Sequence, residues 1–121
     1  MIKKKVSTGT HVLGTIQTKQ IKKLQSLSQV KKHISKAIKQ NGFHELGSFY
    51  YQFPGGKGFT GVICLSESHV AIHTWPELEL LTLDVYICNY SKDNSKGCKK
   101  VFEEIAKFFE PEKIKVKIIK R

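Results

Sequence analysis

The chain has 121 residues, of which 40% are hydrophobic and 26% are charged, and its formal net charge is +11. This length and composition favour one globular domain with a single core, and they do not favour a disordered chain. No stretch approaches the roughly 18 apolar residues of a membrane-spanning helix, and no apolar signal core follows the basic residues 3–5. We therefore expect a cytoplasmic protein that does not enter a membrane.

The cysteines argue against structural cross-links. Cys64, Cys88 and Cys98 are odd in number and form no C-x-x-C pair. That pattern disfavours both a disulfide framework and a zinc site. We expect free thiols and no bound metal.

The positive charge is concentrated in the first half of the chain. Residues 1–67 carry 11 Lys against 2 acids, a net charge of +9, and residues 68–121 carry 9 Lys and 1 Arg against 8 acids, a net charge of +2. A basic surface can bind nucleic acid through counterion release. The arginines expected of specific base readout are nearly missing, however, so we favour a solvated lysine-rich surface with nonspecific binding at most.

The first predicted elements are a strand and a long helix. Residues 7–18 are rich in β-branched residues and contain Gly9 and Gly14, which is typical of a strand with close backbone approaches. From Lys19 to Gln40 apolar residues recur on one helical face and lysines fill the remainder, which predicts an amphipathic helix covering a sheet. Asn41-Gly42 supplies a C-terminal stop.

Three further strands are predicted around a glycine-rich loop. Aromatic residues mark a strand at 43–53, and apolar runs predict strands at 59–65 and 78–89. The loop 54–58 contains three glycines and a lysine. It lacks the G-x-x-x-x-G-K-[ST] spacing and no helix follows it, so we exclude a phosphate-binding loop.

The last elements are a helix and a strand. Capping residues at 93–95 and an apolar stripe predict a helix through Phe109, and alternation of lysine with apolar residues predicts a strand at 113–120. With the strand that follows Ser68, the order is β-α-β-β-β-β-α-β. Such an order favours an α+β two-layer sandwich, with an antiparallel sheet and two helices on one face.

The stretch from Leu65 to Glu77 is the richest in reactive groups. It reads Leu-Ser-Glu-Ser-His-Val-Ala-Ile-His-Thr-Trp-Pro-Glu, with an acid, a hydroxyl and two histidines within seven residues. In a regular strand Ser68 and His73 point to opposite faces. They can meet only if the backbone bends at Glu67-Ser68. A bent peptide there favours attack of the Ser68 hydroxyl on the adjoining backbone carbonyl, that of Glu67. Ser-Glu-Ser is also ordinary turn chemistry.

Glu67-Ser68-His69 followed by His73-Thr74-Trp75-Pro76-Glu77 resembles the self-processing segment of the small prokaryotic, pyruvoyl-dependent S-adenosylmethionine decarboxylases. The resemblance starts at Gly9-Thr10-His11 and continues to Cys88. It departs at Thr15, where the family normally has an acid four positions after the histidine. The resemblance implies one decarboxylase domain over residues 1–121, self-cleaved between residues 67 and 68.

The resemblance also implies roles for individual residues. Ser68 Oγ would attack the Glu67 carbonyl to form an ester, with Thr60 helping to hold the oxyanion. His73 would then remove the Cα proton of residue 68, which becomes a pyruvoyl group. That group would act as electron sink when carbon dioxide leaves the substrate, and Cys88 would return a proton as general acid.

For the substrate, the resemblance implies that Glu77 binds the ribose hydroxyls and makes Phe53 a candidate for stacking on the adenine. The product would be the aminopropyl donor of spermidine synthesis. The resemblance further implies a homodimer of processed protomers with active sites near the subunit interface, which would cover the helix-free face of the sheet.

Several alternatives remain open at this point. Thr15 and the altered loop 54–58 leave room for a pyruvoyl-dependent arginine or ornithine decarboxylase of the same kind. Cys88 with His73 would suit a cysteine hydrolase, although no helix start lowers the thiol pKa in this reading. A noncatalytic partner subunit is a further possibility, and a lysine-rich nucleic-acid-binding module would remain one polypeptide.

Overall fold

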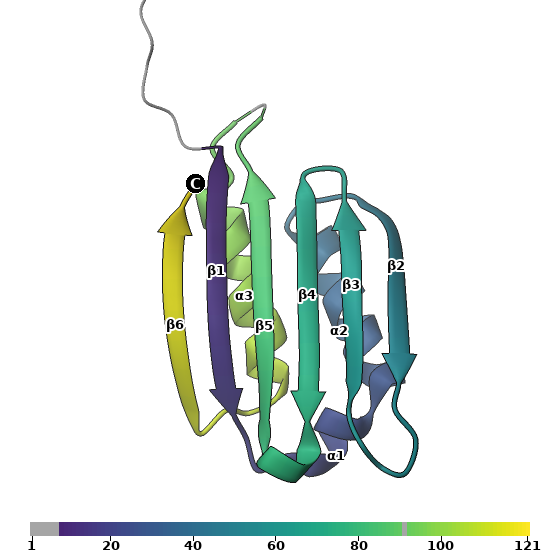
Figure 1. Ribbon diagram of the computed structural model, residues 1–121. Helices are drawn as coiled ribbons and strands as arrows, with labels where there is room; N and C mark the ends of the chain where they lie inside the picture. The colour runs from purple at the N-terminus through teal and green to yellow at the C-terminus, as the bar shows by residue number, and fades with distance from the viewer. Residues whose placement is uncertain (1–7, 91) are drawn as a thin grey trace, which may run out of the picture.

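In the computed structural model, which describes residues 8–90 and 92–121, a six-stranded antiparallel sheet is covered by helices on one face (Figure 1). The strands are β1 (Gly9–Gln17), β2 (Glu45–Gln52), β3 (Phe59–Leu65), β4 (Ser68–Trp75), β5 (Leu80–Cys88) and β6 (Lys113–Lys120). The helices are α1 (Ile21–Gln25), α2 (Leu27–Gln40) and α3 (Ser95–Phe108), with a 3-10 turn, η1, at Pro76–Leu78.

The sheet has the strand order β2-β3-β4-β5-β1-β6. Strands β2 to β5 follow one another as a meander, and β1 lies between β5 and β6. Along β1 the register places Gly9 opposite Cys88 and Gln17 opposite Leu80. The beginning of β1 therefore lies beside the end of β5, where Cys88 is found.

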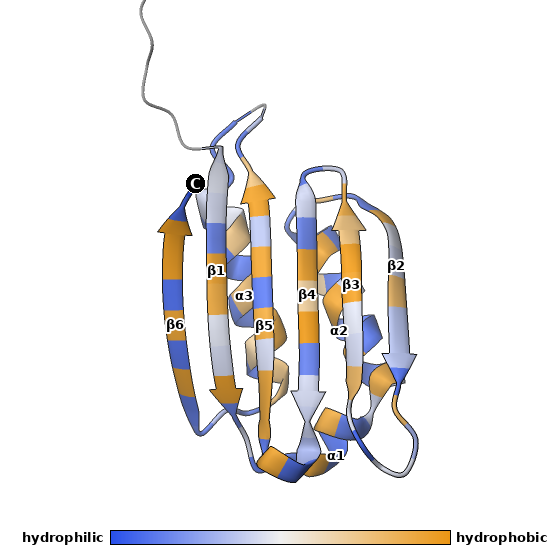
Figure 2. Cartoon of the chain, viewed as in Figure 1, coloured by the Kyte–Doolittle hydropathy of each residue, from blue (hydrophilic) through white to orange (hydrophobic). Residues whose placement is uncertain are grey.

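The core lies between the sheet and the helices. Alternate residues of the central strands point inward and are buried, which produces the alternating bands of hydropathy along β5 in Figure 2. Helix α3 packs against β5 and β1, and α2 packs against β2 and α3. Fully buried side chains of this core include Ile16, Leu24, Ile34, Phe59, Ile63, Ile72, Leu81, Leu83, Ile87, Ile105 and Phe109.

The predicted α+β architecture is confirmed, with a correction to the first helix. The sequence predicts one helix over residues 19–40, but the chain leaves the helical conformation at Ser26 (φ −97°, ψ 82°) and the helix is divided into α1 and α2. Near the break, the carbonyl of Leu24 accepts a hydrogen bond from Thr74 Oγ1 (2.7 Å). This anchor holds α1 against β4 and η1, while α2 extends to cover β2.

Element boundaries differ slightly from the predictions. Ser7, in the predicted first strand, lies outside the described residues. The strand predicted from Leu78 begins at Leu80, because Pro76–Leu78 forms η1 and Glu79 (φ 54°) is left-handed. In the parts of the chain that the structure describes, no helix is long and apolar enough to cross a membrane.

The opposite face of the sheet bears no helix in the described residues. The side chains that alternate with the core residues of β4 and β5 point to this helix-free face and are half-buried. They include His69 and His73 of β4 and Cys88 of β5. His69, His73 and Cys88 therefore belong to this face, whereas Ser68 has the strand parity of the core residues.

Candidate active site

The predicted cut site lies in a strained turn. Residues 66 and 67 form the turn between β3 and β4, and Ser68 is the first residue of β4. Ser68 has a φ of 135°, a region that L-residues rarely adopt. The bend that the motif requires at Glu67-Ser68 is present, and cutting this peptide would release the strain.

The carbonyl of Glu67 is held by the end of β5. The backbone N–H of Cys88 donates to Glu67 O at 2.8 Å, and Ser68 lies opposite Ile87 in the ladder. An N–H at this distance is suited to stabilising negative charge that develops on a carbonyl oxygen. Sequence reasoning assigned only the thiol of Cys88, and its backbone amide was missed because sheet register decides which amide meets which carbonyl.

A buried asparagine joins the two sides of this turn. Asn94, which is 3% exposed, donates from Nδ2 to Cys88 O (2.9 Å) and to Glu67 Oε2 (3.2 Å). The sequence indicated Asn94 only as a possible helix cap. We call Glu67, Ser68, Cys88 and Asn94 the cleavage cluster.

Three rings pack beside the cleavage cluster on the helix-free face. The ring centroids of His11, His69 and Tyr86 are 5.4 to 6.1 Å apart. Burial lowers the pKa of His11 below 6.5, His69 and Arg121 lower it further, and Asp84 opposes them. His11 is therefore favoured in its neutral form.

A second group of predicted residues lies at the other end of the same face. The Oγ1 atom of Thr60 is 2.6 Å from Nδ1 of His73, and the rings of His73 and Trp75 have centroids 6.1 Å apart. Next to them is a hollow of about 330 Å³, lined by Phe53, Pro54, Lys57, Gly58, Thr74, Trp75 and Glu77. The structure thus brings Phe53 and Glu77 together, and we call Phe53, Thr60, His73 and Glu77 the histidine cluster.

The two clusters are separated within one chain. Ser68 and His73 are five residues apart on β4, which corresponds to roughly 16 Å at about 3.3 Å per residue. Figure 1 shows β4 running from the β3–β4 turn at the top to η1 at the bottom. One chain therefore does not bring His73 to Ser68, nor Thr60, which lies opposite His73, to the Glu67 carbonyl.

The chain was compared with known protein families. A sequence profile described as S-adenosylmethionine decarboxylase matches residues 10–121. The chain belongs to this family. Membership confirms the predicted pyruvoyl-dependent carboxy-lyase chemistry, with a group generated from the chain itself, and it does not favour the alternative functions.

Individual relatives of the decarboxylase family show the same likeness. The chain is 34% identical over 113 residues to a protein of Persephonella marina named S-adenosylmethionine decarboxylase proenzyme, covering 93% of this chain and 81% of that protein. A protein of the same name from Sulfurihydrogenibium sp. is 35% identical with the same coverage. The crystal structure of the adenosylmethionine decarboxylase of Aquifex aeolicus superposes with a TM-score of 0.86 at 29% identity, covering 97% of this chain and 92% of that chain.

The three thiols of this decarboxylase family member are free and differ in environment. Cys98 is buried, and its Sγ lies 3.2 Å from Thr10 O and 3.4 Å from Val85 O. Burial raises the pKa of Cys98 to about 11. Cys88 is half-buried on the helix-free face, so of these two thiols it is the one placed for chemistry.

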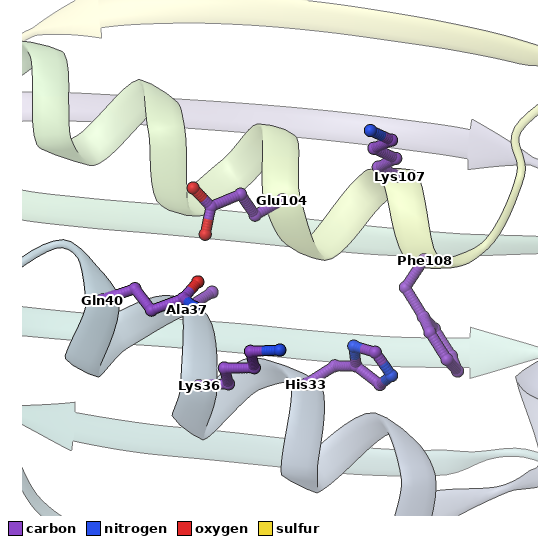
Figure 3. Close-up of a pocket in the computed structure, with 7 residues that line it drawn as sticks. All are labelled: His33, Lys36, Ala37, Gln40, Glu104, Lys107 and Phe108. Carbon is purple, nitrogen blue, oxygen red and sulfur yellow. The ribbon is translucent and has the colours of Figure 1, made fainter.

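The helix side of the decarboxylase fold carries a groove of a different kind. A groove of about 290 Å³ lies between α2 and α3, lined by His33, Lys36, Ala37, Gln40, Glu104, Lys107 and Phe108 (Figure 3). It contains no residue of either cluster and lies on the other side of the sheet. Among residues 8–90 and 92–121, no group of three or more His, Cys, Asp or Glu side chains is arranged to hold a metal ion.

Proposed function

We propose that the chain is a proenzyme that cuts itself between Glu67 and Ser68, keeps a pyruvoyl group at residue 68, and decarboxylates S-adenosylmethionine to the aminopropyl donor of spermidine synthesis. The observation that carries this proposal is the Cys88 amide on the Glu67 carbonyl (2.8 Å) next to the strained backbone of Ser68 (φ 135°). A polarised carbonyl and a strained peptide both lower the barrier to attack by the serine hydroxyl.

The cut proceeds by an acyl shift and an elimination. Ser68 Oγ attacks the Glu67 carbonyl carbon, the C–N bond breaks to leave an ester, and the hydroxyl proton passes to the nitrogen of residue 68. His73 removes the Cα proton of residue 68, which expels the Glu67 carboxylate. Water then displaces the nitrogen as ammonia and leaves a ketone at residue 68. This ketone supplies the electron sink for loss of carbon dioxide.

The separation of the two clusters supports a homodimer with shared sites. In a two-fold dimer the same face of both chains is used, and a two-fold axis that runs across the strands makes the two ends of the sheet exchange places. The histidine cluster of one chain then meets the cleavage cluster of the other. The helix-free face also exposes large apolar side chains, with Phe49 72% and Val62 48% exposed, which a second sheet would cover.

The hollow of the histidine cluster suits a nucleoside. Phe53, in ring contact with Tyr51 (5.0 Å between centroids), offers an aromatic face for adenine. The carboxylate of Glu77 lines the same hollow and would accept hydrogen bonds from the ribose hydroxyls. Cys88 of the other chain would return the proton to the carbon that loses its carboxylate. The resulting specificity favours S-adenosylmethionine over a free amino acid.

The test is the intact mass of freshly purified chain beside a Ser68→Ala variant. We expect the wild type to divide into residues 1–67 and 68–121, with residue 68 as the blocked, ketone-bearing end, and the variant to stay whole. Release of carbon dioxide is then measured with S-adenosylmethionine, arginine and ornithine. A wild type that stays whole would overturn the self-cleavage, and release from arginine or ornithine alone would overturn the substrate.

A further inference from the structure

Asn94 occupies a helix start but does not cap it. It is the residue before α3, where an asparagine side chain ordinarily accepts a hydrogen bond from the first turn. No such side-chain cap is made at Asn94. The neighbouring Asp93 instead accepts a hydrogen bond from the backbone N–H of Ser95 (2.9 Å). The side chain of Asn94 is therefore available for another purpose.

That side chain is directed at the cleavage cluster. An amide nitrogen has two hydrogens, and Nδ2 of Asn94 has two acceptors, the carbonyl of Cys88 (2.9 Å) and the carboxylate of Glu67 (3.2 Å). The bond to Glu67 is charge-assisted and lies at a residue that is 3% exposed, so water competes weakly for it.

The backbone of Asn94 is itself held in place. Its N–H donates to Asn89 Oδ1 (2.8 Å), and its carbonyl accepts from the N–H of Cys98 (2.9 Å) in α3. A rigid helix start thus carries the bridging amide, whereas Glu67 lies in a two-residue turn. The hydrogen bond from Asn94 Nδ2 therefore ties Glu67, at the peptide that would be cut, to the fixed start of α3.

We infer that Asn94 is a positioning residue for self-cleavage. By holding the Glu67 side chain and the Cys88 carbonyl together, it keeps the Glu67 carbonyl on the Cys88 amide at 2.8 Å while Ser68 is held at a φ of 135°. This inference rests on the proposed self-cleavage and assigns the Glu67 carboxylate a role as anchor. A misplaced carbonyl would lose the donor that stabilises its negative charge.

The experiment measures the rate of cleavage of full-length chain made by cell-free translation, stopped in acid at intervals and analysed by intact mass. We expect Asn94→Ala and Asn94→Asp to be cut at least about tenfold more slowly than wild type. Asp93→Ala is the matched control, because it removes the hydrogen bond at the start of α3 without touching Glu67 or Cys88. It should be cut at the wild-type rate.

A charge exchange separates positioning from mere folding. In Asn94→Asp two carboxylates face each other, whereas Asn94→Asp with Glu67→Gln restores the contact between residues 67 and 94 with donor and acceptor exchanged, while the hydrogen bond to Cys88 O stays lost. We expect the double variant to be cut faster than Asn94→Asp, with Glu67→Gln alone as baseline. Thermal unfolding of each variant in a Ser68→Ala background checks that it is folded.

The outcomes are distinct. Asn94 does not position the cut if the Asn94 variants are cut as fast as wild type. The same conclusion follows if their cleavage is slowed no more than that of Asp93→Ala and the double variant is cut no faster than Asn94→Asp. If wild-type chain is never cut, the proposed self-cleavage itself fails and the inference fails with it.

Discussion

The Nδ1 atom of His73 lies 2.6 Å from the hydroxyl oxygen of Thr60 on the neighbouring strand. When Nδ1–H donates to Thr60, the other ring nitrogen, Nε2, carries no proton and can act as a base. A hydroxyl can also donate to Nδ1, so acceptance by Thr60 is our prediction, and it is the arrangement that the proposed elimination needs. This role differs from the oxyanion contact that the sequence suggested for Thr60.

Replacing Thr60 tests that relationship. Thr60→Val keeps the shape of the side chain but removes the acceptor, and we expect cleavage to slow by about tenfold to a hundredfold. Thr60→Ser keeps the hydroxyl and should be cut at close to the wild-type rate. The measurement is the time course of intact mass. Equal rates for the valine and serine variants would contradict the tautomer role.

Shared active sites predict complementation between two inactive chains. Ser68→Ala and His73→Ala are each expected to stay whole when expressed alone. Expressed together, they form mixed dimers in which Ser68 of one chain meets His73 of the other, so the His73→Ala chain should be cut. Mass spectrometry identifies which chain is divided. If neither chain is cut in the mixture while the wild type is, the site lies within one chain.

Replacing Cys88 should affect decarboxylation of the substrate but not self-cleavage of the chain. Cys88→Ser keeps the backbone N–H on Glu67 O, so the chain should still divide. A serine hydroxyl is a much weaker acid than the thiol, and we expect decarboxylation to fall by about a hundredfold or more. The rate of carbon dioxide release, per mole of cut chain, checks this. The matched control is Cys64→Ser, at an exposed thiol in neither cluster, which should change neither step.

Thr74 should be important for stability because its buried hydroxyl joins three elements. Oγ1 donates to Leu24 O (2.7 Å) in α1 and accepts from Phe59 N (2.9 Å) in β3. Thr74→Val leaves both partners buried without a hydrogen bond, and we expect a loss of about 2–4 kcal/mol in the free energy of unfolding. Thr74→Ser keeps the hydroxyl and should lose less. Urea unfolding in a Ser68→Ala background measures both, and equal losses would contradict this reason.

His11 should make the protein sensitive to acid. Its pKa in the folded chain is below 6.5, chiefly because burial disfavours the charged ring. The unfolded chain then binds the proton more readily, so the stability contributed by neutral His11 is present above pH 6.5 and is lost as the pH falls through the folded-state pKa.

The test compares thermal unfolding of His11→Gln and wild type from about pH 7.5 to 5. His11→Gln should lose less stability on acidification, by less than about 1 kcal/mol because solvent still reaches part of the ring. The control His33→Gln changes an exposed histidine of α2 and should follow the wild type. Parallel curves for His11→Gln and wild type would contradict the prediction.

Local patterns were enough to predict most elements. The alternation of lysine and apolar residues over 113–120 and the apolar run 59–65 coincide with β6 and β3, because strand periodicity is a property of neighbouring residues. The single helix predicted over residues 19–40 was wrong. Its break at Ser26 is associated with a hydrogen bond from Thr74, a residue about fifty positions later, and helical periodicity carries no information about such a contact.

By itself the sequence determined the chemistry. The order and spacing of residues 67–77, with Cys88 beyond them, identified the decarboxylase family, because one sequence encodes all the groups that this chemistry needs. Only the tertiary structure decided how the groups are distributed. Sheet register places the Cys88 amide on Glu67, the start of α3 brings Asn94 to both, and the rise along β4 separates Ser68 from His73. These are contacts between distant segments, and they arise only when the strands pair.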